Sequence, residues 1–218
     1  GRVETLKFSD GTAIDLTGGL GMTGSGQADS IVGTVLADTI SGLGGNDSID
    51  GRDGADTING NEGNDGIEGG AGNDILNGNE GNDTLSGGGD DDLLTGGSGA
   101  DTSSGGLGAD TFRFLTIADS GVGAARDVIT DYNRAQGDLI DLSGIDASDL
   151  VPGDTAFTFI GTNLFSGAKG ELRFTVSGGN TIVEGSVSGG NTVDFQIQVN
   201  GVLPVSYTHL RAHETRED

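Results

Sequence analysis

The sequence of 218 residues contains no cysteine and no tryptophan. Without cysteine, no disulfide bond can supplement a small apolar core. Basic residues are scarce, at 10 against 34 acidic residues, and the net charge is -24. Because such a chain repels phosphates, we expect no nucleic-acid partner. No apolar run approaches the roughly 18 residues that span a membrane, so we expect no membrane span. The charge balance favours a cation as the partner.

Aromatic residues are absent from the first half of the chain. No Phe, Tyr or Trp occurs from Ser9 to Thr111, whereas seven of the eight Phe lie at or after Phe112. The first half therefore cannot build an aromatic core, and low hydrophobicity with high net charge is typical of disorder. Only internal order in the sequence would overturn that expectation.

Histidine occurs only at His209 and His213, near the end of the chain. The surrounding stretch, Val205 to Thr215, is similar to one translated frame of a common transposase sequencing adaptor. We therefore expect residues 205–218 to be an artefact without ordered structure and the chain to be a fragment. The i, i+4 spacing of the histidines also suits a zinc-binding helix, but we favour the adaptor interpretation.

The sequence nevertheless contains a nine-residue repeat. Steps of nine from Asp29 to Asp110 meet Asp at all ten positions, and Gly lies five residues before each Asp. An apolar residue lies two positions after nine of the ten, with Ser103 as the exception. A disordered segment would not keep the Gly, Asp and apolar positions in one register through ten copies. Gly at positions one and four permits a tight turn, and positions seven to nine predict a strand of three residues with position eight pointing inward.

One inward apolar residue per repeat is a thin core. Burying one Ile or Leu stabilises the fold less than ordering nine backbone residues costs. We therefore expect the polypeptide alone not to fold and a bound cation to supply the deficit. Collagen requires Gly at every third position, and an EF-hand requires acidic or amide ligands at alternate positions with Glu at the twelfth, and the sequence has neither pattern.

The repeats resemble the RTX (haemolysin-type) motif Gly-Gly-x-Gly-x-Asp-x-(large apolar)-x, most clearly at residues 69–77 and 105–113. The resemblance implies an all-β fold, with a parallel β-roll over residues 23–113. Two repeats make one coil of eighteen residues, and Ca²⁺ lies between successive turns on each side. Five turns per side leave at most eight sites, of which we expect about six to be well formed, because Gln27, Leu36 and Asp90 replace a turn Gly.

The implied calcium ligands are Asp carboxylates and the carbonyls of the turns. The carboxylates are Asp38, Asp47, Asp56, Asp65, Asp74, Asp83, Asp92, Asp101 and Asp110. The carbonyls of position one belong to Gly42, Gly51, Gly60, Gly69, Gly78, Gly87, Gly96 and Gly105. Those of position three belong to Gly44, Asp53, Glu62, Ala71, Glu80, Gly89, Ser98 and Leu107.

The flanking segments predict other β structure. Residues 1–22 contain two strands around Asp10-Gly11 and are similar to the segments that connect RTX blocks. Residues 114–204 predict antiparallel strands at 157–160, 171–176, 181–184 and 194–199, with turns at 178–180 and 189–191.

The stretches 126–147 and 165–174 look like the C-terminal domain of serralysin metalloproteases, which follows a β-roll. The resemblance implies a truncated antiparallel C-terminal domain. Two interpretations fit its acidic residues, a further calcium site or turn capping, and we favour turn capping. These residues are Asp127, Asp131, Asp138 and Asp141.

The sequence predicts no catalysis in this chain. Outside the tail it has no histidine, so it lacks both the His-Glu-x-x-His zinc motif and a base for a serine nucleophile. Three functions fit. The first is a calcium-binding module of a secreted bacterial protein, which passes through type I secretion machinery and folds on calcium outside the cell. The others are the non-catalytic C-terminal part of a serralysin-like zinc metalloprotease, and a segment of a calcium-dependent adhesin.

Overall fold

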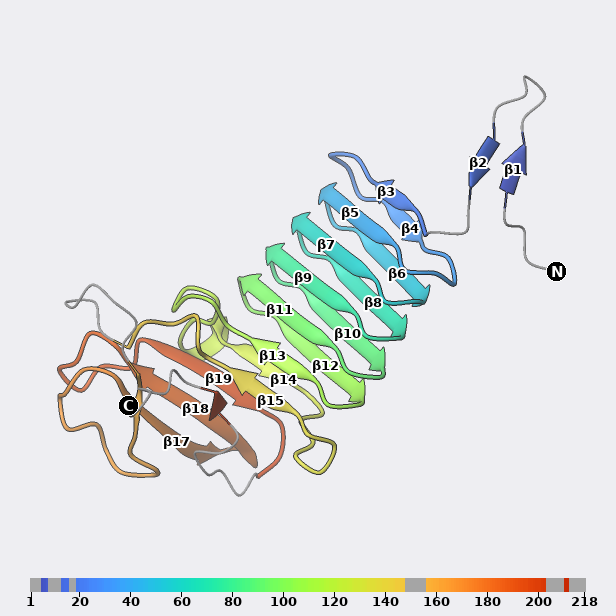
Figure 1. Cartoon of the computed structure of the whole chain (residues 1–218). Coiled ribbons are helices and arrows are strands. Elements are labelled where there is room, and N and C mark those ends of the chain that lie inside the picture. Colours follow the sequence, from blue (N-terminus) through green and yellow to red (C-terminus); the bar gives the residue numbers. More distant parts are fainter. Residues whose placement is uncertain (1–4, 8–12, 16–18, 148–155, 203–209, 212–218) are drawn as a thin grey trace.

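The structure is a computed structural model that describes residues 5–7, 13–15, 19–147, 156–202 and 210–211. It is an all-β molecule, in which a parallel β-solenoid precedes an antiparallel end (Figure 1). The two strands predicted near the start are present as β1 (Thr5–Lys7) and β2 (Ala13–Asp15), which pair antiparallel. The predicted Asp10-Gly11 turn between them lies outside the described residues. No helix of the described segments is long and apolar enough to cross a membrane.

Two parallel sheets form the roll, and the chain alternates between them. One sheet contains β3 (Gly21–Thr23), β5 (Thr39–Gly44), β7 (Thr57–Glu62), β9 (Ile75–Glu80), β11 (Leu93–Ser98) and β13 (Thr111–Arg113). The other contains β4 (Ser30–Val32), β6 (Ser48–Asp53), β8 (Gly66–Ala71), β10 (Thr84–Gly89) and β12 (Thr102–Leu107). Register pairs such as Ile40 with Ile58 lie eighteen residues apart, which confirms the predicted coil of two repeats.

The strands of the central coils are longer than predicted. Each runs for six residues, from position seven of one repeat to position three of the next. The prediction of three residues was wrong because it ended the strand where the glycines begin. In the structure, the backbone beyond Gly42 still pairs with the neighbouring coil, as in the pair Leu43 with Asn61.

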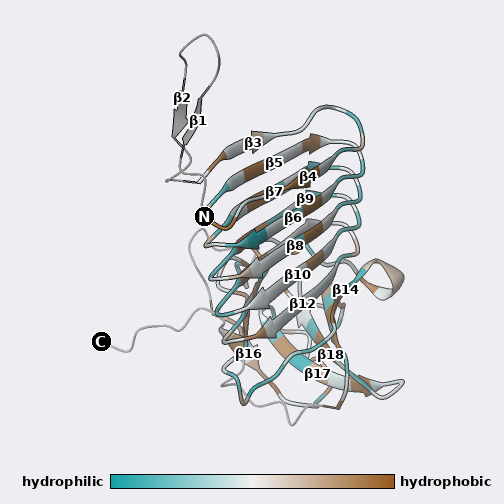
Figure 2. Ribbon diagram, turned by 90° about the vertical axis from the view of Figure 1, so that its right-hand side faces the viewer, coloured by the Kyte–Doolittle hydropathy of each residue, from teal (hydrophilic) through white to brown (hydrophobic). Residues whose placement is uncertain are grey.

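The core of the roll is a single apolar column. Its residues are Ile40, Ile49, Ile58, Ile67, Leu76, Leu85, Leu94 and Phe112, each at most 2% exposed. Figure 2 shows brown patches that recur from strand to strand of the roll among pale and teal residues. Inward-facing position eight is therefore confirmed, and so is the thinness of the core.

Parallel stacking continues past residue 113, where we had placed the end of the roll. β14 (Asp127–Ile129) pairs parallel with β12, and β15 (Leu139–Asp141) pairs parallel with β13. The inward residues Ile129 and Ile140 extend the apolar column. A short 3₁₀ helix, η1 (Gly123–Ala125), precedes β14. The loops between these strands break the nine-residue spacing, so the repeat pattern alone could not predict this coil.

The C-terminal strands complete the larger sheet. β17 (Glu171–Ser177), β18 (Asn180–Ser186) and β19 (Phe195–Val199) are antiparallel neighbours, as predicted. Gly178 and Gly179, at φ 61° and 83°, form the predicted turn between β17 and β18. β16 (Thr158–Phe159), however, pairs parallel with β17, and β19 pairs parallel with β14. One sheet of ten strands therefore joins the roll to the C-terminal region.

The tail contributes one short strand. β20 (Leu210–Arg211) pairs parallel with β15, and Leu210 is buried. The expectation of a tail without ordered structure does not hold for these two residues, because Leu210 covers the open edge beside Ile140. His209 and His213 lie outside the described residues.

Candidate metal centre

The turns of the roll arrange the repeat aspartates in two columns, one along each edge. In each column the backbone N–H of one Asp donates to Oδ1 of the Asp eighteen residues later, at 2.7–3.0 Å. The columns continue past the repeats, since Asp101 donates to Asp127 at 3.0 Å and Asp110 to Asp138 at 3.3 Å. One carboxylate oxygen of each residue therefore fixes the register between coils.

The second carboxylate oxygen, Oδ2, has no hydrogen-bond partner in eight of the turns. These residues are Asp47, Asp56, Asp65, Asp74, Asp83, Asp92, Asp101 and Asp110. Their side chains are only 0–4% exposed. A buried carboxylate oxygen without a donor is costly, and eight of them in one register are therefore candidate cation ligands.

The position-one glycines open a small space beside each of these oxygens. A Cβ on Gly42 would clash with Oδ2 of Asp47 and lie 2.8 Å from the carbonyl oxygen of Gly60 in the next coil. The same pair of oxygens faces each of the five position-one glycines that follow, Gly51, Gly60, Gly69, Gly78 and Gly87. A carboxylate and a carbonyl from adjacent coils thus converge where no side chain fits. Hard oxygen ligands of this kind suit Ca²⁺.

All eight position-one glycines of the predicted ligand set direct their carbonyls toward the preceding coil. They are Gly42, Gly51, Gly60, Gly69, Gly78, Gly87, Gly96 and Gly105. No three acidic or histidine side chains of the described residues converge on a point. Each candidate site therefore depends on few carboxylates and draws its other oxygens from the backbone.

The position-three carbonyls already accept one hydrogen bond in several coils. The carbonyl of Glu62 accepts from Gly45 N–H and that of Glu80 from Gly63 N–H, both at 2.9 Å. A second lone pair remains on each oxygen. The carbonyls of Ala71, Gly89 and Ser98 are similarly engaged. Gly44, Asp53 and Leu107 occupy the same position on β5, β6 and β12.

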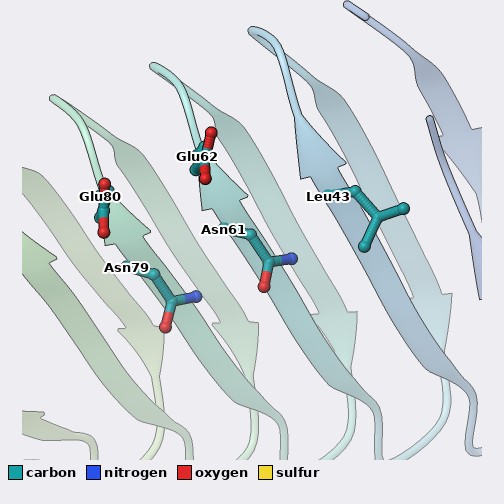
Figure 3. Close-up of a pocket in the computed structure, with 5 residues that line it drawn as sticks. All are labelled: Leu43, Asn61, Glu62, Asn79 and Glu80. Atoms are coloured by element: carbon teal, nitrogen blue, oxygen red, sulfur yellow. The ribbon is translucent and has the colours of Figure 1, made fainter. Parts of the chain in front are cut away.

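The side chains of Glu62 and Glu80 are exposed and line a shallow groove on the outside of the roll with Leu43, Asn61 and Asn79 (Figure 3). These carboxylates lie outside the space between coils. Of Glu62 and Glu80, only the backbone carbonyls therefore remain candidate calcium ligands.

Asp38 differs from the other predicted carboxylate ligands. Its Oδ2 accepts from the N–H of Thr34 at 2.6 Å, and its Oδ1 accepts from the N–H of Leu20 at 2.5 Å. Asp29, in the turn before it, also has a partnered Oδ2, which accepts from Ser25 N–H at 2.6 Å. The sequence signal for this difference is the loss of the second turn glycine at Gln27 and Leu36.

Burial makes ionisation of the column aspartates from Asp56 to Asp110 unfavourable in the absence of a cation. Desolvation, helped by repulsion from neighbouring aspartates, raises the pKa of Asp92 and Asp101 to about 7. It raises the pKa of Asp74, Asp83 and Asp110 to about 6. Backbone hydrogen bonds oppose the shift without cancelling it. A cation beside these groups would favour the ionised form.

The four acidic residues after the repeats all accept hydrogen bonds from the backbone, but Asp127, Asp131 and Asp138 accept them from the preceding coil, which turn capping did not predict. Asp131 accepts from the N–H groups of Gly105 and Gly106, at 3.0 and 2.9 Å, and Asp141 accepts from Ser143. Asp127 and Asp138 instead continue the two columns. Sequence reasoning missed that role because they lie 26 and 28 residues after their partners.

Comparison with known proteins identifies the repeat. The family model described as RTX calcium-binding nonapeptide repeat (4 copies) matches residues 23–58, 32–67, 51–85, 68–103 and 77–112. Among solved structures, the AlgE6R3 subunit of the Azotobacter vinelandii mannuronan C5-epimerase is 26% identical, with a TM-score of 0.39, over 86% of this chain and 79% of that chain. The AlgE6R2 subunit is 25% identical, with a TM-score of 0.41, over 87% and 90%. No curated protein matches the chain. The β-roll of this protein is therefore an RTX calcium-binding repeat module.

Proposed function

We propose that this chain is the calcium-binding module of a secreted bacterial protein, which folds on binding calcium outside the cell after type I export. The observation that carries the proposal is the set of eight buried Oδ2 atoms without a hydrogen-bond partner. Each would be left uncompensated in a folded chain without a cation, and one apolar residue per strand offers little to offset that cost.

Coupling of folding to calcium follows from this imbalance. When the site does not exist in the unfolded chain, the free energy of binding becomes free energy of folding. Extracellular calcium modules have dissociation constants of about 10⁻⁴–10⁻³ M. Cytosolic calcium lies far below that range, so the chain would stay unfolded inside the cell and in an exporter. The net charge of -24 supports the same order of events, because it opposes compaction until cations bind.

We further propose that the chain is not itself an enzyme. Its buried aspartates are accounted for as acceptors in the columns and as calcium ligands, which makes them poor general acids. A second candidate function is the non-catalytic C-terminal part of a serralysin-like zinc metalloprotease, favoured by the resemblance of residues 126–147 and 165–174. An upstream His-Glu-x-x-His motif in the gene would favour this candidate, whereas a long repeat array without one would favour an adhesin.

Far-UV circular dichroism of the full chain during a calcium titration after chelation tests the proposal. We expect a cooperative gain of β signal with calcium and none with magnesium. Asp83→Asn, which alters a partnerless carboxylate, should raise the calcium midpoint. Glu68→Gln is the matched control, since it removes one exposed charge from the same roll and should leave the midpoint nearly unchanged. Equal β signal in chelator would refute calcium-coupled folding.

A further inference from the structure

The ten turns of the roll have two backbone conformations. In the eight turns with a partnerless Oδ2, the residue at position two is left-handed. These residues are Leu43, Arg52, Asn61, Gly70, Asn79, Gly88, Gly97 and Gly106, with φ between 77° and 116°. The first two turns carry Ser25 and Thr34 at this position, and neither has a positive φ. Conformation and carboxylate environment therefore change together.

The second conformation supplies the carboxylate with donors from its own turn. The N–H and hydroxyl of Ser25 both donate to Oδ2 of Asp29, at 2.6 and 2.8 Å. The N–H of Thr34 donates to Oδ2 of Asp38 at 2.6 Å, and its hydroxyl donates to Oδ1 at 3.2 Å. We call these two turns hydroxyl-capped and the other eight open.

The residue at position four explains which of the two conformations a turn adopts. All eight open turns are left-handed there, with Gly in seven and Asp90 at φ 74° in the other. The hydroxyl-capped turns have Gln27 and Leu36, which do not adopt positive φ. Their N–H groups donate instead to the hydroxyls of Ser25 and Thr34, at 3.3 and 3.2 Å. The hydroxyl thus connects position four to the Asp.

A related arrangement, in which two residues supply the N–H and the hydroxyl, occurs on the other side of the open turns. At Asp119, the N–H of Leu115 donates to Oδ2 and the hydroxyl of Thr116 donates to Oδ1, both at 2.6 Å. The N–H of Ala118 donates to that hydroxyl at 3.2 Å. Hydroxyl-capped aspartates therefore bracket the eight open turns along the chain.

We propose that Ser25 and Thr34 replace calcium in the first two turns, so that only open turns take an ion. An N–H and an O–H directed at the carboxylate already provide charge-assisted hydrogen bonds. An ion could bind there only after these bonds break, and the donor hydrogens point their positive ends toward its position. This inference rests on the proposed function, because it concerns which turns take the calcium.

Native mass spectrometry of the full chain in calcium tests the inference by counting ions. The double variant Thr34→Gly, Leu36→Gly gives the turn of Asp38 glycine at both deciding positions, and we expect one ion more than in the unsubstituted chain. The control Thr34→Val removes the hydroxyl but resists the left-handed conformation, and it should gain none. The reverse variant Asn79→Thr, Gly81→Leu should cap the turn of Asp83 and lose one ion.

Circular dichroism in calcium confirms that each variant is folded before its ions are counted. An unchanged count in either folded double variant would overturn the inference. If the opening variant does not fold, the reverse variant decides alone. If the unsubstituted chain binds no calcium at all, the proposed function fails instead, so the two failures are distinguishable.

Discussion

The roll and the C-terminal strands differ in the hydrogen bonding of their buried carboxylates. In the C-terminal region each has donors of its own: Glu184 pairs with Arg173 at 2.8 Å and accepts from Gln196 at 2.7 Å. Glu171 accepts from the N–H and hydroxyl of Ser166 at 2.8 and 2.6 Å. In the open turns of the roll, one oxygen of every Asp has no partner. The C-terminal part of the sheet thus supplies donors to its buried carboxylates, whereas the open turns leave one oxygen of each column aspartate without a protein donor.

The apolar packing of the C-terminal region is also more extensive than that of the roll. The C-terminal region packs aromatic rings, such as Phe157 edge-on to Phe195 with centroids 5.9 Å apart. The roll places one aliphatic side chain per strand in its column. Two regions can therefore share a continuous sheet and still differ in what stabilises them. The predictions below test that difference.

Removal of calcium should have the largest effect, and it should be confined to the roll. In chelator we expect amide hydrogen exchange of residues 39–112 to lose its protection, whereas residues 171–199 keep more of theirs. The physical reason is that only the roll contains partnerless buried carboxylates among the described residues. Uniform loss across both regions would show that the C-terminal strands need the roll and would contradict the comparison.

Truncation of the apolar column should have the next largest effect. Leu76→Ala in the calcium-bound chain should lower the free energy of unfolding by about 2–5 kcal/mol, because Leu76 is fully buried and few neighbours can close the cavity. Leu164→Ala, at a residue 82% exposed, is the matched control and should change it by less than about 0.5 kcal/mol. Thermal or denaturant unfolding in saturating calcium measures both.

Acidity should act in opposite directions with and without calcium. The pKa of Asp92 and Asp101 is about 7 in the folded chain, above the ordinary 3.8, so the folded state binds more protons between these values. The calcium-free roll should therefore gain stability as pH falls from 8 to 5, and that contribution is lost above about pH 7. Calcium affinity should fall over the same interval, because protons compete for the carboxylates. Calorimetric calcium titrations at pH 5.5 and 8 measure the calcium affinity. An affinity independent of pH would contradict the prediction.

The smallest predicted effect concerns a turn outside the roll. Gly178→Ala should cost about 1 kcal/mol, because Gly178 is left-handed but a Cβ there would meet nothing within 4 Å. Gly60→Ala is the contrasting change, since its Cβ would clash with Oδ2 of Asp65 and lie 2.9 Å from the carbonyl oxygen of Gly78. We expect Gly60→Ala to weaken calcium binding and Gly178→Ala to leave it unchanged, as calorimetry would report.

The nine-residue register made much of the roll predictable. Gly, Asp and an apolar residue recur at fixed spacing, so the inward column followed from the sequence, whereas the eighteen-residue coil was implied by the resemblance to the RTX motif. The coil of β14 and β15 did not, because loops of irregular length separate Asp127 and Asp138 from the residues they pair with. The hydroxyl-capped turn of Asp38 also escaped prediction. It depends on Thr34 and Leu36 together, and only the substitution at Leu36 stood out against the repeat.

The hydrogen-bonded columns of aspartate have one further consequence. At every step from Asp29 to Asp138 the earlier coil donates its N–H and the later coil accepts through Oδ1. The two ends of the stack are therefore chemically unlike, as in a polar filament. Two copies placed with their first coils together would present no donor to continue the columns, since Oδ1 of Asp38 already accepts from the N–H of Leu20. Only a head-to-tail arrangement could do so, and the C-terminal strands β18 and β19 already lie beyond the last coil of one sheet.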